Sequence, residues 1–86
     1  MNKQFYIDRI DALREAIERL PEDVRICSIG QGDHDDLCVQ ILEHPNVRGE
    51  LIETWPDKPK KGWFETNGAE GVTIGWVGRV ANGMDR

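Results

Sequence analysis

Residues 6–20 read YIDRIDALREAIERL, and this stretch decides how the rest of the chain has to be arranged. Its apolar residues recur at steps of three and four, which places them on one stripe of an α-helix. The stripe consists of Tyr6, Ile10, Leu13, Ile17 and Leu20. Pro21 cannot extend the helix without losing a backbone hydrogen bond, so the helix is predicted to end near Leu20. Leu13 and Ile17 lie at the centre of the stripe and are predicted to face the main core.

After this helix the chain carries short β-branched runs between turn residues, with no second helical period. Strands are predicted over residues 24–29, 37–42, 50–55, 63–66 and 72–80. The sequence therefore predicts an α+β fold, in which one N-terminal amphipathic helix packs on a four- to five-stranded, mainly antiparallel sheet arranged as a meander. With 86 residues the chain is too short for two cores, so one domain over 1–86 is expected, with a frayed tail at 81–86.

The first two predicted strands flank a run of turn residues, and pairing them about Gly32 and Asp33 gives one apolar face. That face holds Val24, Ile26, Leu37, Val39 and Ile41. The same register places Cys27 directly opposite Cys38, where a disulfide is geometrically possible. Reduced thiols are favoured over a bridge because the N-terminus does not read as a secretory signal. A longer loop with a shifted register is the alternative.

The run Asn67–Gly71 predicts a second hairpin, between strands 63–66 and 72–80. The last strand places four apolar residues on one face, namely Val72, Ile74, Trp76 and Val80. Gly75 and Gly78 interrupt this strand and indicate a bulge or a close neighbour. Residues 57–61, with the sequence DKPKK, are predicted to form an exposed loop.

Sixteen acidic residues against eleven basic ones give the chain a net charge of -5. This balance argues against direct binding to nucleic acid, whose phosphates would be repelled. Hydrophobic residues make up 38% of the chain and form no long uninterrupted run, so no membrane association and a cytoplasmic location are predicted. An acidic surface fits a basic protein partner, and it fits plain solubility equally well.

The densest polar cluster consists of Asp33, His34, Asp35 and Asp36, followed by Cys38. Carboxylate, imidazole and thiolate groups can all bind metals, but consecutive residues in a tight turn point apart. Neither His34 nor His44 is well placed to activate a cysteine as a nucleophile. We therefore predict no metal, no cofactor and no enzyme, and keep a small metal- or thiol-dependent enzyme built on residues 33–38 as an alternative.

Two groups of residues are predicted to contact a protein partner. The acidic group consists of Glu22, Asp23, Asp33, Asp35 and Asp36, and the aromatic group of Trp55, Trp63 and Phe64. Neighbouring residues of a strand point to opposite faces, so either Trp63 or Phe64 has to leave the core. An exposed aromatic ring bordered by charges is typical of a protein-binding patch.

The sequence as a whole favours a small acidic, non-enzymatic protein-binding or regulatory domain. One specific version is an inhibitor that mimics nucleic acid and occupies a nucleic-acid-binding protein, as compact phage anti-defence proteins do. A further alternative is a homo-oligomeric accessory or structural subunit, whose edge strand and exposed tryptophan are buried against a copy of the chain.

Overall fold

A computed structural model describes residues 3–32 and 36–80, which form one helix and five strands. The elements are α1 (Lys3–Glu18), β1 (Ile26–Gln31), β2 (Leu37–Ile41), β3 (Glu50–Trp55), β4 (Lys58–Ala69) and β5 (Val72–Arg79). The predicted α+β fold, with an N-terminal helix beside a mostly antiparallel sheet, is confirmed. In this part of the chain no helix is long and apolar enough to cross a membrane. The predicted tail at 81–86 lies outside the described residues.

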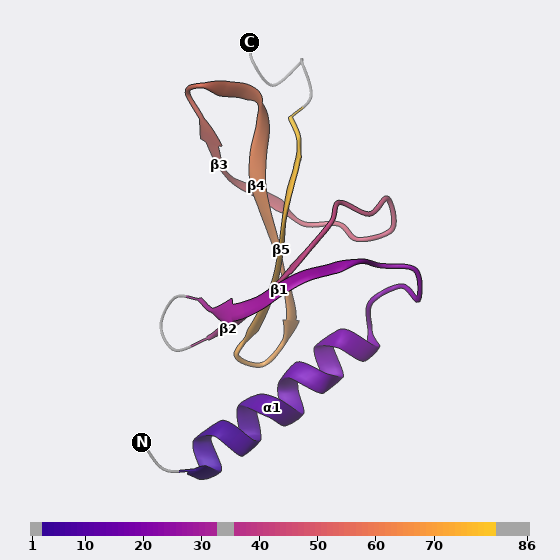
Figure 1. Ribbon diagram of the computed structural model, residues 1–86, viewed down its shortest axis with the longest axis vertical. Coiled ribbons are helices and arrows are strands. Elements are labelled where there is room, and N and C mark those ends of the chain that lie inside the picture. The colour runs from indigo at the N-terminus through magenta and orange to yellow at the C-terminus, as the bar shows by residue number, and fades with distance from the viewer. Residues whose placement is uncertain (1–2, 33–35, 81–86) are drawn as a thin grey trace.

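The five strands form a single sheet in the order β1-β2-β5-β4-β3, which differs from the predicted meander. Strands β3, β4 and β5 are joined by hairpins, but β2 pairs with β5 in a parallel ladder that runs from Leu37 with Val72 to Gln40 with Gly75. Residues 42–49 carry the chain from β2 to β3 at the far edge of the sheet (Figure 1). The two central strands, β2 and β5, also hold most of the buried side chains. The order of strands thus places the most apolar segments away from the edges.

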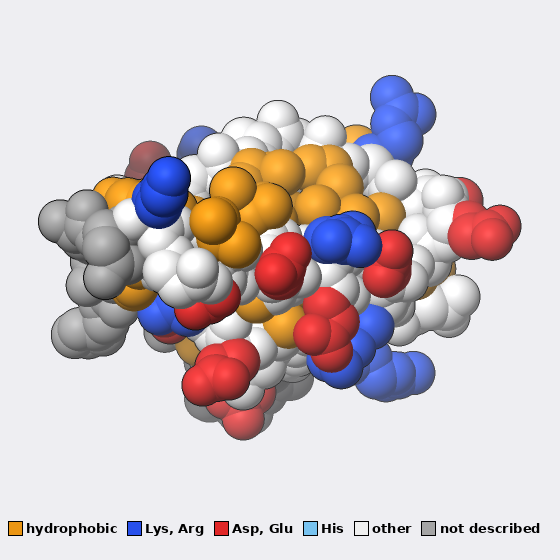
Figure 2. Space-filling view, turned by 90° about the horizontal axis from the view of Figure 1, so that it is seen from below, with side chains coloured by type: hydrophobic (Ala, Val, Ile, Leu, Met, Phe, Trp, Pro, Cys, Tyr) orange, Lys and Arg blue, Asp and Glu red, His pale blue; other side chains and the backbone are white. Residues whose placement is uncertain are grey.

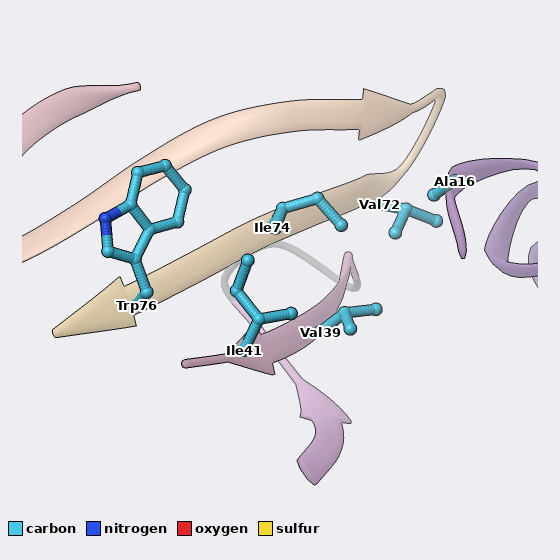
Figure 3. Close-up of a cluster of buried hydrophobic side chains, with 6 residues drawn as sticks. All are labelled: Ala16, Val39, Ile41, Val72, Ile74 and Trp76. Atoms are coloured by element: carbon cyan, nitrogen blue, oxygen red, sulfur yellow. The ribbon is translucent and has the colours of Figure 1, made fainter. Parts of the chain in front are cut away.

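The core lies on one face of β2 and β5 and is closed by the helix. Its buried residues are Ala16, Val39, Ile41, Val72, Ile74 and Trp76. Figure 3 shows these side chains as a row, with Ala16 of α1 beside Val72 at one end and Trp76 at the other. Phe64 of β4 extends the row, because its ring stacks on Trp76 with the ring centroids 6.0 Å apart.

The predicted stripe of the helix is only partly confirmed, because Leu13 and Leu20 pack against the core while the stripe as a whole is turned away from the sheet. The buried residue of the helix is Ala16, whereas Ile10 is 59% exposed and Tyr6 is also exposed, so these two members of the predicted stripe are outside the core. Leu13 packs against the core while only partly buried, and Ile17 is half-buried. The physical reason is the close approach of α1 to β4.

Gly68 of β4 sets that close approach. A Cβ atom at Gly68 would lie 2.8 Å from the Cβ atom of Ala16, so both positions have to be small. The guanidinium of Arg19 also donates a hydrogen bond of 3.0 Å to the carbonyl oxygen of Gly68. The helix therefore meets β4 through Ala16, and Leu13 packs against the core beside this contact.

The register of the first hairpin is shifted by three positions from the prediction. Ile29 pairs with Val39 and Gly30 pairs with Cys38, so Cys27 is not opposite Cys38 and no disulfide joins the two residues. The shift arises because the turn is longer than predicted: the amide of Gly32 donates to the carbonyl of Asp36. Every residue of β1 is exposed, so no buried face fixes the register in favour of the predicted one.

The strand β4 begins earlier than predicted. It starts at Lys58 after a turn at Pro56 and Asp57, so the predicted loop at 57–61 is wrong. The lysines are accommodated because they stand on exposed positions of a strand that pairs with both β3 and β5. The second hairpin is confirmed, with a tight turn at Glu70 and Gly71 in which Gly71 has a φ of 76°.

Candidate functional site

The two aromatic residues Trp63 and Phe64 lie on opposite faces of the sheet, as the alternation of a strand requires. Phe64 pairs with Trp76 and faces the core, whereas Trp63 pairs with Val77. We call the face that carries Trp63, Gly75 and Val77 the open face. Both α1 and the 42–49 connection lie against the other face, where Ala16 meets Gly68 and Glu43 approaches Gly78. The ring that leaves the core is therefore that of Trp63.

Trp63 is fixed in place on the open face by two contacts. Its indole ring lies directly over Gly75, where any Cβ atom would overlap the ring. Its Nε1 donates a hydrogen bond of 2.7 Å to a carboxylate oxygen of Glu65, which lies two residues along the same strand and so on the same face. Gly75 thus has the close neighbour that the sequence indicates, and the indole is held flat against the strand.

A hollow of about 280 Å³ lies on one side of Trp63, near the β3–β4 turn. Its lining consists of Trp55, Asp57, Lys58, Lys61 and Val77. Val77 is 38% exposed, which is high for a large apolar residue in the interior of a sheet. Trp55 is half-buried, so this end of the open face combines two apolar side chains with two lysines. It lies at the opposite end of the molecule from α1 (Figure 1).

A second hollow, of about 290 Å³, lies further along β4 in the other direction from Trp63. Its lining consists of Gly49, Glu50, Ile52, Glu65, Thr66, Asn67 and Thr73. Glu50 and Glu65 form a direct cross-strand pair here, so this end of the face is acidic. The indole of Trp63 therefore lies between a basic hollow and an acidic one.

The predicted acidic group is divided between the two ends of the β1–β2 hairpin. Glu22 and Asp23 are exposed and precede β1, whereas Asp36 is partly buried and follows it in the turn to β2. Asp33 and Asp35 lie outside the described residues. The structure therefore places the first pair and Asp36 some distance apart, separated by the length of β1.

Asp23 is instead tied to the chain that follows β2. Nε2 of His44 lies 2.7 Å from a carboxylate oxygen of Asp23, and Nδ1 of His44 accepts a hydrogen bond of 3.1 Å from the amide of Asn46. Because Nδ1 is an acceptor, Nε2 carries the proton and donates to Asp23. This hydrogen bond from His44 lowers the pKa of Asp23 from its ordinary value. The pair connects the start of β1 to the 42–49 connection.

Within residues 3–32 and 36–80, no three His, Cys, Asp or Glu residues gather in a group that could hold a metal ion. The predicted cluster at 33–38 falls mostly outside these residues, so the alternative of an enzyme built on it stays a prediction. Sequence analysis missed Lys61, Glu65 and Val77 as parts of the candidate surface. Lys61 and Glu65 lie two residues from Trp63 along the strand and so on the same face, and Val77 pairs with Trp63. The register between β4 and β5 is needed to bring these residues together with Gly75.

The chain was also compared with known proteins. No family model, no curated protein and no solved structure matches it.

Proposed function

We propose that this chain is a small acidic, non-enzymatic protein-binding domain whose contact surface is the open face around Trp63. The observation that carries the proposal is a half-buried indole ring, held by Gly75 and Glu65 on a sheet face that neither α1 nor the 42–49 connection covers. Tryptophan is enriched among the residues that dominate binding energy at protein interfaces. A ring that is already fixed also loses little conformational freedom on binding, which favours affinity.

The surroundings of Trp63 support a protein partner rather than a small molecule. Both hollows beside it are lined by charged side chains, one by lysines and the other by glutamates. A central aromatic residue with a charged rim has the organisation of a protein interface, in which the charges select the partner and the apolar centre supplies affinity. A partner with the reversed order of charges would be complementary.

The net charge of -5 supports a partner with a basic surface, such as a nucleic-acid-binding protein, because long-range attraction speeds the encounter. An inhibitor that occupies such a protein is one form of this proposal. The separation of Glu22 and Asp23 from Asp36 favours the open face over an acidic row as the main contact. On this proposal the acidic residues steer the partner and Trp63 anchors it.

The proposal is tested by capturing the partner from the native host and measuring its binding kinetics with purified variants. Trp63→Ala should weaken binding by about 2 kcal/mol or more, which is roughly a 30-fold increase in Kd. The loss should appear mainly as faster dissociation, since the association rate depends on charge. Surface plasmon resonance separates the two rates.

Tyr6→Ala is the matched control, because Tyr6 is an exposed aromatic residue on α1, away from the open face. It should bind like the parent protein. Circular dichroism has to show that both variants are folded. Equal binding by parent and Trp63→Ala would exclude the open face as the contact surface, and turnover of a small molecule in the absence of any protein partner would favour the enzyme alternative.

A further inference from the structure

The strand β1 forms one edge of the sheet and is exposed along its whole length. It pairs with β2 on one side, and on its other side no strand from residues 3–32 and 36–80 lies next to it. All six of its residues are exposed, including Ile26 and Ile29, the latter at 48%. Its sequence, ICSIGQ, contains no charged residue and no proline. An uncharged, apolar edge of this kind is ready to pair with another strand.

The other edge of the sheet is built differently. The strand β3 reads ELIETW and carries the two acidic residues Glu50 and Glu53. Charged side chains on an edge strand discourage pairing with a second chain, because like charges would be brought together. Protection is thus present at the β3 edge and absent at the β1 edge.

The hydrogen-bonding groups of β1 also point the right way for a further strand. The amide of Gly32 donates to the carbonyl of Asp36 on the β2 side of the hairpin. Because backbone groups alternate along a strand, Gly30 likewise faces β2, whereas Ile29 and Gln31 direct their N–H and C=O groups outward. These outward groups lie in the regular part of β1, beyond the irregularity between Ile26 and Ser28.

We propose that β1 is a dimer interface, in which β1 of one copy pairs antiparallel with β1 of a second copy. A two-fold axis makes such an interface self-complementary, because each residue contacts the same strand in the partner. The two sheets then become one continuous sheet. Ile29 points to the same face as its pair partner Val39, so the exposed isoleucines of the two copies meet on the face that carries α1.

Charge at the two ends of β1 supports a second copy as the occupant. Arg25 immediately precedes β1 and is exposed, whereas Asp36 lies in the turn at the other end. Antiparallel pairing brings Arg25 of one copy towards Asp36 of the other, on both sides of the two-fold axis. Of the two acidic residues that precede Arg25, Asp23 is held by His44, and Glu22 lies three residues before Arg25. The central residues of β1 are uncharged, so the net charge of the chain does not oppose the contact there.

Exposed apolar side chains of β1 add to the driving force, because Ile26 and Ile29 are 41% and 48% exposed and pair with the core residues Ile41 and Val39. Figure 2, seen from the side of α1, shows hydrophobic side chains gathered in a band with acidic and basic groups along its margins. Exposed apolar patches with a charged margin mark interaction sites on soluble proteins. The two-fold operation places both helices on the same face of the joined sheet, which lets this surface contribute.

Sedimentation equilibrium on the full chain, from low micromolar to submillimolar concentration, tests the proposal. The parent should have twice the mass of the 9.8 kDa chain at the upper end of this range. Ile29→Lys introduces a charge into the edge, and in the dimer it brings two like charges together. It should raise the dimer dissociation constant by about tenfold or more.

Ile52→Lys is the matched control, because Ile52 lies on the opposite edge strand and is 51% exposed. It makes the same change of residue and charge and should dimerise like the parent. Amide spectra by NMR show whether both variants keep the fold. A parent that stays monomeric over the whole range would overturn the proposal, as would an equal effect of the two lysine substitutions.

Trp63→Ala separates this inference from the proposed function. Trp63 lies on β4, away from the β1 edge, so the variant should remain a dimer even where it loses the protein partner. Raising the salt concentration should weaken the dimer if Arg25 and Asp36 contribute across the interface. Arg25→Glu should weaken it as well, and an unchanged dissociation constant in this variant would contradict the antiparallel arrangement.

Discussion

At the scale of single residues, the contact between Trp63 and Gly75 explains why a glycine occupies a central strand. A side chain at Gly75 would collide with the indole ring, so Gly75→Ala should displace Trp63 and break its hydrogen bond to Glu65. The expected cost is about 1–3 kcal/mol, the range for overpacking. Thermal unfolding measures the loss, and a change in tryptophan fluorescence reports the displaced ring.

Gly30→Ala provides the comparison for this prediction. Gly30 is also a strand glycine, but a Cβ atom there would meet nothing within 4 Å. Replacement should leave the stability unchanged or raise it by a few tenths of a kcal/mol, because alanine restricts the unfolded chain. Equal effects of the two substitutions would show that the indole does not rest on Gly75.

The separation of Trp63 from Phe64 could be predicted from the sequence, because it follows from the alternation of a strand alone. Which ring leaves the core could not. That depends on the pairing of Phe64 with Trp76 across two strands, and the sequence does not state the register. The predicted acidic group is also divided in the structure, because the strand β1 runs between Glu22 and Asp36.

At the scale of elements, the helix shows that an apolar pattern alone does not determine which of its residues are buried. The apolar stripe of α1 predicts a core position for Ile10, whereas the structure gives that role to Ala16. Ala16→Leu should therefore destabilise the protein by about 1–3 kcal/mol through overpacking against Gly68. Ile10→Ala should change stability by about 0.5 kcal/mol or less, as for an exposed position. Chemical denaturation measures both, and the reverse order of effects would restore the predicted stripe.

The strands differ in how well the sequence predicts them, and burial explains the difference. The strand β5 alternates between buried and less buried residues, so its apolar face was correctly identified as Val72, Ile74 and Trp76. The strand β1 buries nothing, so its pattern carries no information about register and the predicted pairing of the cysteines failed. The run DKPKK resembles a loop in composition, yet its position between two pairing strands makes it part of β4.

At the scale of the whole molecule, the fold class follows from the sequence but the order of strands does not. A helical period followed by several strand-like runs is sufficient for an α+β fold. The parallel pairing of β2 with β5 has no local signal, because the two strands are separated in the chain by β3 and β4. Parallel strands need a long connection, and here two other strands form part of it.

The central position of β5 has a consequence for how the protein is made. The core is shared between segments at opposite ends of the chain, with Ala16, Val39 and Ile41 made early and Ile74 and Trp76 made last. During synthesis β2 lacks the strand that joins it to β4 until residues 72–79 have emerged, so formation of the complete core is expected to wait for them. A truncated chain of residues 1–71 keeps the sequence of α1 and the first four strands and should nevertheless show no cooperative melting. If calorimetry found a cooperative transition in that fragment, the early segments would be able to fold without the strand that joins them.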